Sequence, residues 1–541
     1  MSEESIKIGY IVSVAGSRVS GILISPDAAG PDHDEAALTD AVQIGKLIKV
    51  FTPRSVAFGV VSSLEVRNPS SPPSSADARI LEIELFGEAI STDSDGEGGF
   101  VFQRGVSVYP GLGQTIYATT TGDLARIYAR PDASNIRIGS LYQDDTLPAY
   151  AVTDDLLGKH FAVLGTTGTG KSCTVALLLR SILNAHPQGH IVLLDPHGEY
   201  GAAFGDMAEM VTPDSLQLPY WLLNSEEVLE VMCSKEGPQR EAEAAIVKEA
   251  VMNAKRAYAG GGETSQHITV DTPVPYRLGG LLQTLDDMMG QLDNPESSLP
   301  YLRIKARVES LRNDPRFSFM FSGISVRDSM AEVLSKILRL PVAGKPVTII
   351  DLSGVPSEIV DVVVSLLCRL VFDFALWSER ANATPVLFVC EEAHRYIPRD
   401  VSKGFEPTRK AISLIAKEGR KYGVSLCLVT QRPSELSETI LSQCNTLFSL
   451  RMANDQDQEF VQRALPESAA GLLNALPALR TQEAIVVGEG VNLPMRIRFD
   501  SLTDDQRPRS ATAPFSAAWD QDRDNSGLVD ETIERWRRQV R

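Results

Sequence analysis

The sequence predicts an α/β fold with a parallel sheet, preceded by a small β-barrel, in a chain of two or three domains. Residues 5 to about 140 contain short β-prone runs separated by turns, whereas apolar strands alternate with helical segments from Leu157 onward. A glycine-rich loop that starts at Gly165 joins one of these strands to a helix. A length of 541 residues exceeds what a single hydrophobic core fills, so several domains are expected.

The N-terminal part, residues 1–145, is expected to form the barrel because many short strands follow one another at close spacing. Segments rich in Pro, Ser, Gly and Asp interrupt the strands at residues 25–40, 68–78 and 91–99, and we interpret them as loop insertions. The β-prone runs are "IKIGYIVSVAG", "SGILIS", "IGKLIKVFT", "SVAFGVVSS", "ILEIELFGEAI" and "QTIYATT".

The next part is expected to form one α/β domain from two pieces, residues 146–222 and 339–500. The segment 223–338 between them carries several helical stretches and is too long for a simple crossover, so we interpret it as a helical insertion. Residues 501–541 are expected to form a polar tail that ends in a helix, "DETIERWRRQVR". The predicted parallel strands are Phe161–Leu164, His190–Leu194, Val347–Ile350, Val386–Cys390, Val424–Thr430 and Thr446–Met452.

The composition is that of a globular protein, with 43% hydrophobic and 23% charged residues. No apolar run approaches the length of a membrane span and the N-terminus is too polar for a signal peptide, so we expect a cytoplasmic protein without membrane contact. The six cysteines form no C-x-x-C pair, which favours reduced thiols over disulfides or a zinc site.

Charge is distributed unevenly along the chain. The net charge of −18 argues against a protein that wraps nucleic acid over its whole surface. The segment Val401–Arg432, referred to below as the basic segment, nevertheless carries seven basic residues against two acidic ones. It is either a surface that contacts an anion or an ordinary solvated helix face.

The segment Gly165–Ser172, "GTTGTGKS", fits the spacing G-x-x-x-x-G-K-[ST] of a loop that wraps the phosphates of a nucleotide. Its glycines allow successive backbone N–H groups to converge, and the following helix directs the positive end of its dipole at the anion. We expect Lys171 to reach the β- and γ-phosphates and Ser172 to bind Mg²⁺. The expected ATP contacts are Gly165, Thr166, Thr167, Gly168, Thr169, Gly170, Lys171, Ser172 and Cys173.

Two acidic residues follow the strand Val386–Cys390, at the edge where ligands bind in open α/β sheets. Phosphoryl transfer requires an acid for the metal ion and a group that activates water. We expect Glu391 to bind Mg²⁺ through its water shell and Glu392 to activate the attacking water. Gln431 follows the strand Val424–Thr430 at the same edge and is expected to sense the γ-phosphate.

Other polar residues near these strands keep two interpretations each. Asp195 and Glu199, in "DPHGEY", are candidates to line the site, whereas helix capping and turn formation are equally open for Asp195 and for Asp351 in "DLSG". Histidines such as His197 and His394 are more often packed or hydrogen-bonded than catalytic. Cys173 is at a helix N-terminus, which can lower a thiol pKa, but packing within the helix is the simpler interpretation.

Arg420, in "AKEGRKYG", lies just before the strand that carries Gln431. If subunits form a ring, an arginine at this position can enter a neighbouring site and stabilise transition-state charge. The alternative is a simple surface ion pair with Glu418.

Six motifs, in order, resemble those of the HerA family of hexameric DNA translocases, in the FtsK–HerA group of RecA-like P-loop ATPases. They are "GTTGTGKS", "LLDPHGEY", "IIDLSG", "VCEEAHRYIP", "EGRKYG" and "VTQRPSELSETILSQCNT", and the likeness extends from about residue 5 to 500. The resemblance implies a HAS-type barrel, a RecA-like core with a helical insertion, a homo-hexameric ring, and double-stranded DNA in a central pore. It also implies that Lys171 and Glu392 are essential for ATP turnover and that Arg420 acts in trans.

One residue departs from the family pattern. Family members often carry arginine just before the histidine upstream of the phosphate loop, where this chain has Lys159. Lysine is a point charge rather than a planar fork, so we expect a nucleotide contact with altered geometry.

The resemblance also implies a partner protein that docks on the barrel. It would be a NurA-type nuclease in DNA end processing, or another nuclease or a sirtuin-type NAD-consuming effector in anti-phage defence. The chain itself has no nuclease constellation of clustered Asp, Glu and Lys.

Three functions remain open from the sequence. The first is an ATP-driven DNA translocase whose basic segment contacts phosphates without reading bases. The second is an ATP-regulated hexameric scaffold that arrays an effector enzyme with little translocation. The third, a two-lobed RNA helicase suggested by "EEAH", requires a second RecA-like lobe, and too few residues follow Phe499 to build one.

Overall fold

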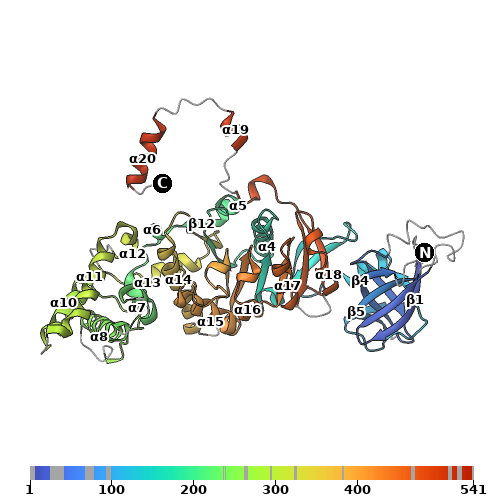
Figure 1. The fold of residues 1–541 in the computed structure, drawn as a ribbon, viewed down its shortest axis with the longest axis horizontal. Helices are drawn as coiled ribbons and strands as arrows, with labels where there is room; N and C mark the ends of the chain where they lie inside the picture. The colour runs from blue at the N-terminus through green and yellow to red at the C-terminus, as the bar shows by residue number, and fades with distance from the viewer. Residues whose placement is uncertain are drawn as a thin grey trace. The chain divides into compact units, whose positions relative to one another are not determined.

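Figure 1 shows the fold of the chain in a computed structural model. The chain divides into two compact units, Met1–Pro508 and Arg509–Arg541. Nearly all residues of the three expected loop insertions lie outside the part that the structure describes. The described residues are 6–24, 42–66, 78–92, 99–234, 237, 239–260, 266–292, 295–321, 326–379, 383–464, 470–509, 515–520 and 527–538.

The predicted barrel is confirmed within the described residues (Figure 1). Antiparallel strands follow the order β2-β1-β7-β3-β4-β5, and pairing of β2 with β5 closes the ring, while β6 extends β5. Alternate side chains such as Ile8, Ile48 and Leu81 point inward and form the barrel core. The strands are β1 Lys7–Ala15, β2 Arg18–Leu23, β3 Leu47–Phe51, β4 Ser55–Val66, β5 Arg79–Thr92, β6 Gly99–Arg104 and β7 Thr115–Ala118.

The second sheet has eleven described strands in the order β12-β13-β11-β14-β15-β10-β16-β17-β18-β8-β9. The first seven are parallel and confirm all six predicted strands. The sixth ends at Ser449, opposite Leu164 of β10, rather than at Met452. The parallel strands are β10 Phe161–Leu164, β11 His190–Asp195, β12 Ala208–Val211, β13 Val347–Asp351, β14 Val386–Cys390, β15 Val424–Thr430 and β16 Thr446–Ser449.

Four antiparallel strands complete this sheet: β8 Asn135–Leu141, β9 Pro148–Val152, β17 Glu483–Gly488 and β18 Met495–Phe499. Two of them, β8 and β9, lie on either side of the domain boundary expected at residue 145, and β8 pairs with β18. The α/β sheet therefore begins before that boundary. A short β-prone run does not reveal which sheet it joins, since strand pairing depends on tertiary neighbours.

Helices cover both faces of the parallel strands, as expected. Alternate strand residues such as Val163 and Leu164 belong to two different cores. One core packs against α4 (Lys171–Ala185), and the other against α14 (Ser357–Trp377) and α15 (Glu406–Tyr422). All seven parallel strands end at one edge of the sheet, and the loops after β10, β11, β14 and β15 therefore converge there.

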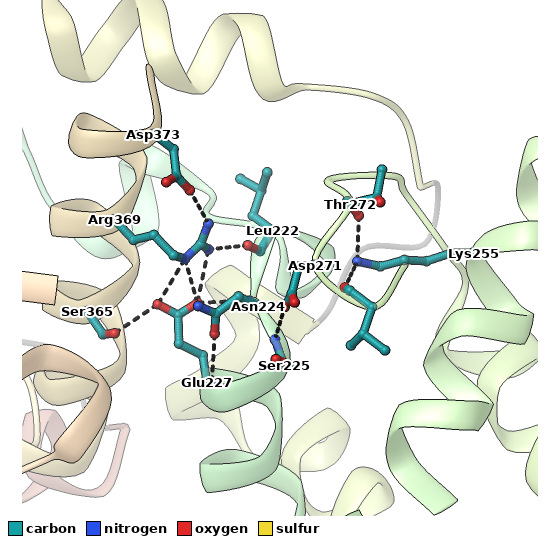
Figure 2. A network of polar contacts seen from close by, with 11 residues as sticks. Leu222, Asn224, Ser225, Glu227, Lys255, Asp271, Thr272, Ser365, Arg369 and Asp373 are labelled. Carbon is teal, nitrogen blue, oxygen red and sulfur yellow. Dashed lines mark hydrogen bonds and ion pairs between the residues drawn. The ribbon is translucent and has the colours of Figure 1, made fainter. Parts of the chain in front are cut away.

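The predicted helical insertion is confirmed. Arg369 of α14 anchors it through Glu227, whose side chain is buried and also accepts a hydrogen bond from Ser365 at 2.8 Å (Figure 2). The guanidinium lies 3.0 Å from Glu227 Oε2 and 3.1 Å from Asp373 Oδ2. The helices are α7 Ser225–Met232, α8 Gln239–Ala259, α10 Leu278–Gly290, α11 Leu299–Asn313, α12 Ser318–Phe321 and α13 Met330–Leu338.

The C-terminal unit contains α19 (Phe515–Trp519) and α20 (Leu528–Arg538) among its described residues. The helix expected at the end of the chain is thus confirmed over its described part. Within the described ranges, no helix has the length and apolar character that crossing a bilayer requires.

Candidate nucleotide site

The phosphate loop leaves the carboxyl end of β10 and leads into α4. Gly168 and Gly170 have φ values of +77° and +98°, which side-chain-bearing residues rarely adopt. Such a conformation lets successive N–H groups converge on an anion. A Cβ atom on Gly165 would lie 2.8 Å from the Cβ of Leu450, so the loop also has no room for a side chain at this position.

Lys171 lies at the first turn of α4, and its Nζ donates to the carbonyl of Thr166 at 3.1 Å. Burial is the largest influence on the pKa of Lys171 and lowers it. The carboxylates of Glu391, Glu392 and Glu199 act in the opposite direction, by favouring the ammonium form. The structure thus places Lys171 among acids that come from two other strand ends.

Two hydrogen bonds join the phosphate loop to other strand ends. Ser172 donates from Oγ to Glu199 Oε2 at 2.9 Å. Thr167 donates from its hydroxyl to the side-chain carbonyl of Gln431. Gln431 therefore lies at the loop, as its expected role requires, and Glu199 contacts Ser172 of the same loop.

Asp195, by contrast, stabilises the turn that follows β11. It is fully buried and accepts hydrogen bonds from the backbone N–H groups of His197 at 3.3 Å and Tyr200 at 2.9 Å. Burial is the main cause that raises the pKa of Asp195. The turn fixes the position of Tyr200. No local sequence pattern marks this residue as part of the site, since nothing near it in the sequence distinguishes it from a core tyrosine.

Glu391 is buried and accepts a hydrogen bond from the Tyr200 hydroxyl at 2.8 Å. Burial is the largest cause that raises the pKa of Glu391 to about 8; Tyr200 and Lys171 lower it and Glu392 raises it further. A cation beside the carboxylate would favour its charged form, which suits an acid that faces a metal ion.

The oxygen donors at this edge fit Mg²⁺, which prefers carboxylate, hydroxyl, water and phosphate oxygens. They are Ser172, Glu199 and Glu391. Among the described residues no group of three or more His, Cys, Asp or Glu side chains is arranged to hold a metal ion without other ligands. A magnesium ion at this place would share its coordination with phosphates and water, as Mg²⁺ usually does at nucleotide sites.

Glu392 lies next to the phosphate loop and has a left-handed backbone conformation, with φ +52° and ψ +44°. Its two carboxylate oxygens face two histidines. Oε1 lies 3.7 Å from His197 Nε2 and Oε2 lies 3.2 Å from His394 Nδ1. Both histidines thus lie within ion-pair distance of the predicted base.

Lys159 lies at the opposite edge of the sheet from the phosphate loop. It pairs with Asp155 at 2.7 Å and with Glu489. The four residues of β10 separate Lys159 from the loop by about 13 Å, at about 3.3 Å per residue. Within its own chain Lys159 is therefore distant from the phosphate loop, because strand length separates two residues that are close in sequence, and its contact with nucleotide stays a prediction.

Arg420 lies at the same distant edge, in the last turn of α15, with its side chain exposed. The alternative ion pair with Glu418 does not form, because Glu418 pairs with Lys421 at 2.6 Å instead. Within the part of the chain that the structure describes, no carboxylate lies within ion-pair distance of Arg420. The side chain is left available for a group outside its own chain.

The basic segment carries less free charge than its composition suggests. Each of its basic residues except Lys417 and Arg420 forms an ion pair with a described Asp or Glu. The pairs are Lys403–Asp400, Arg409–Glu406, Lys410–Glu226, Lys421–Glu418 and Arg432–Glu435. All involve exposed carboxylates, and exposed pairs are weak enough for a phosphate to compete with them.

All six cysteines are free thiols, as expected. Cys173 is partly buried in α4, and burial is the main cause that raises the pKa of its thiol. The packing interpretation of this residue fits the structure better than an activated thiol. Its contact with nucleotide stays a prediction.

Comparison with known proteins shows which proteins this chain is similar to. The family model "Helicase HerA, central domain" matches residues 136–371, and the match starts within β8. The DNA double-strand break repair helicase HerA of Pyrococcus furiosus is 25% identical over 480 residues, covering 79% of this chain and 82% of the relative. The probable DNA double-strand break repair helicase HerA of Methanocaldococcus jannaschii is 28% identical, covering 70% and 78%.

Among solved structures, VirB4 of Thermoanaerobacter pseudethanolicus is similar in fold, with a TM-score of 0.50 and 14% identity. The similarity covers 70% of this chain and 99% of VirB4. The central-domain match begins at the strand where the α/β sheet begins and includes the phosphate loop, and the relatives align over most of both chains. On these grounds residues 136–371 match the central domain of HerA helicases, the chain is similar to HerA helicases over most of its length, and its core has a P-loop ATPase fold.

Proposed function

We propose that the protein hydrolyses ATP to translocate along or unwind double-stranded DNA. The observation that carries the proposal is the meeting of Lys171, Glu391, Glu392 and Gln431, from three different strand ends, around one glycine-rich loop. The relatives' description as DNA double-strand break repair helicases supports DNA as the substrate.

The loop residues Gly165–Ser172 would bind the triphosphate through their backbone N–H groups and the Lys171 ammonium. Ser172 would hold Mg²⁺ directly, and Glu391 through its water shell. When bound, this ion neutralises charge on the β- and γ-phosphates. Glu199 Oε2 accepts a hydrogen bond from Ser172 Oγ at 2.9 Å. This bond would direct the lone pairs of the hydroxyl oxygen toward the ion.

Glu392 would orient the attacking water and accept its proton while the water oxygen bonds to the γ-phosphorus and the bridging oxygen leaves with ADP. Gln431 would detect whether the γ-phosphate is present, because its amide already contacts Thr167 of the loop. Tyr200 donates a hydrogen bond to Glu391, so Glu391 has a different hydrogen-bonding partner from Glu392 and is not assigned to the activation of water.

A ring of subunits would give the exposed side chain of Arg420 a role. The side chain cannot reach the phosphate loop of its own chain, since α15 ends at the amino edge of the sheet. We propose that Arg420 completes the site of a neighbour in a homo-hexamer, with duplex DNA in the central pore near Lys417 and the rest of the basic segment. A nuclease or a NAD-consuming effector, in DNA end processing or anti-phage defence, would act with the ring.

The test is ATP hydrolysis by the purified protein with and without linear duplex DNA, alone and with an effector that co-purifies with it from its native host. Duplex DNA should raise the rate regardless of its sequence, and the effect should weaken steeply with salt because phosphate contacts release counterions. A rate that ignores duplex DNA in the presence of the effector contradicts the proposal. In that case a scaffold, in which ATP binding regulates assembly, becomes the better interpretation.

A further inference from the structure

The orientation of the Glu392 carboxylate is only partly fixed in this structure. The side chain is 8% exposed, and Oε2 is buried with no hydrogen bond of acceptable geometry among the described residues. A buried acceptor without a donor is costly and calls for an explanation. The nearest donor atom is Nδ1 of His394, at 3.2 Å.

The same nitrogen of His394 hydrogen bonds to the Thr430 hydroxyl at 3.0 Å. Thr430 is fully buried at the end of β15, and its Oγ1 accepts a hydrogen bond from the backbone N–H of Arg432 at 3.0 Å. Its carbonyl accepts from the N–H of Gly165 at 3.3 Å, at the start of the phosphate loop. Thr430 therefore connects the phosphate loop to the segment that carries Gln431 and Arg432.

The protonation of His394 follows from its neighbours. Burial lowers the pKa of His394, which favours the neutral ring with one N–H. An Nδ1 lone pair would face the Glu392 carboxylate at 3.2 Å and be repelled, which puts the hydrogen on Nδ1. This one hydrogen then has two competing acceptors, Glu392 Oε2 and Thr430 Oγ1, and of the two contacts only the one with Thr430 has hydrogen-bond geometry in this structure.

We infer that His394 is a positioning residue that aligns Glu392 only when the segment after β15 releases it. While His394 Nδ1 is hydrogen-bonded to the Thr430 hydroxyl, Oε2 of Glu392 has no donor and the carboxylate is not held in one orientation. A shift of Gln431 or Arg432 on contact with γ-phosphate or DNA draws the Thr430 hydroxyl away, and His394 then donates to Glu392. The inference rests on the proposed function for the identity of the DNA signal, whereas the link among the three side chains does not depend on it.

Two pairs of variants of the full chain test this link. Asn places its amide nitrogen near the position of Nδ1 and Gln does not, so His394→Gln should lower kcat about tenfold or more with little change in KM for ATP, as loss of a hydrogen bond to a charged group implies. His394→Asn should recover most of that kcat. Equal kcat values for the two variants overturn the positioning role.

Thr430→Val removes the competing acceptor, so His394 should donate to Glu392 permanently. Hydrolysis without DNA should rise several-fold above wild type, and the ratio of rates with and without DNA should fall toward one. Thr430→Ser keeps the hydroxyl and should behave as wild type, which also shows that this buried position tolerates substitution. A DNA-free rate in Thr430→Val at or below that of Thr430→Ser overturns the inference, whereas a wild-type rate that ignores DNA contradicts only the proposed function.

Discussion

Tyr200 donates a hydrogen bond to Oε2 of Glu391 at 2.8 Å, although 191 positions separate the two residues in the sequence. Both side chains are buried, and the bond ties the turn after β11 to the end of β14. The acid expected to face the metal ion is thus oriented by a neighbouring strand, and this relationship can be tested directly.

Tyr200→Phe should raise the magnesium concentration that half-saturates ATP hydrolysis by roughly three- to tenfold, since it removes one hydrogen bond to a charged acceptor. The readout is a magnesium titration at fixed ATP. Tyr220→Phe is the matched control, because it removes another buried hydroxyl, which donates a hydrogen bond to the Tyr276 carbonyl of the helical insertion. An identical magnesium response in both variants would show that Tyr200 matters for stability alone.

Lys171→Ala and Glu392→Gln should separate nucleotide binding from hydrolysis. The first removes the cation that contacts the phosphates, so ATP affinity and hydrolysis should both fall. The second keeps the shape of the side chain and removes its basicity, so ATP should still bind while kcat falls by about 10² to 10⁴. A fluorescent ATP analogue and phosphate release measure the two properties. If an effector stays fully active with Glu392→Gln, the result supports the scaffold interpretation and contradicts the translocase interpretation.

Arg420→Ala should lower kcat by about 10³ or more while ATP still binds, as removal of a trans-acting arginine does elsewhere. Because Arg420 lies far from the phosphate loop of its own chain, mixing Arg420→Ala with Lys171→Ala subunits should restore part of the activity by creating some complete sites. Lys421→Ala, one residue away and paired with Glu418, is the control and should retain near wild-type hydrolysis. No recovery on mixing would place Arg420 outside the site.

Arg369→Ala should destabilise the protein by about 3–5 kcal/mol, because it leaves the buried Glu227 carboxylate without its cation. The loss should appear as a lower melting temperature and as faster hydrogen exchange in α7. Arg327→Ala removes a cation of the same helical insertion whose partner Glu332 is exposed, and should cost about 0–1 kcal/mol. Similar losses for the two variants would contradict the anchoring role of Arg369.

Lys255 predicts how stability depends on pH. It is buried with Nζ bonded to the carbonyls of Val270 at 2.6 Å and Thr272 at 2.7 Å, and burial lowers its pKa from 10.5 to about 8. Between these two values the unfolded chain binds more protons at this site than the folded protein, so the free energy of unfolding should rise with pH there. Below about pH 8 both states are protonated and the site adds no slope.

Lys255→Met should flatten this rise, measured as the change in urea midpoint between pH 8 and pH 10. Lys248→Met, at an exposed position of the same helix, should keep the wild-type slope. A slope that survives in Lys255→Met would assign the effect to other groups.

Local sequence patterns determined the phosphate loop and the strands around it. A turn with glycines at left-handed positions is specified by consecutive residues, so Gly165–Ser172 could be recognised without any tertiary contact. The buried parallel strands could be recognised equally well, because a strand that is buried on both faces of a sheet is a continuous apolar run. Glu391 and Gln431 are the first polar residues after two such runs.

Tertiary structure decided which of the remaining polar residues meet. Tyr200, Glu199 and His394 contact the site only because β11, β14 and β15 end side by side, and no local pattern states that order. Lys159 shows the converse, since a residue close to the phosphate loop in sequence lies at the far edge of the sheet. The backbone geometry of a turn is set by neighbouring residues, so the spacing of residue types in the sequence predicts it. Contacts across a sheet depend on strand order, which is fixed only when the whole core packs.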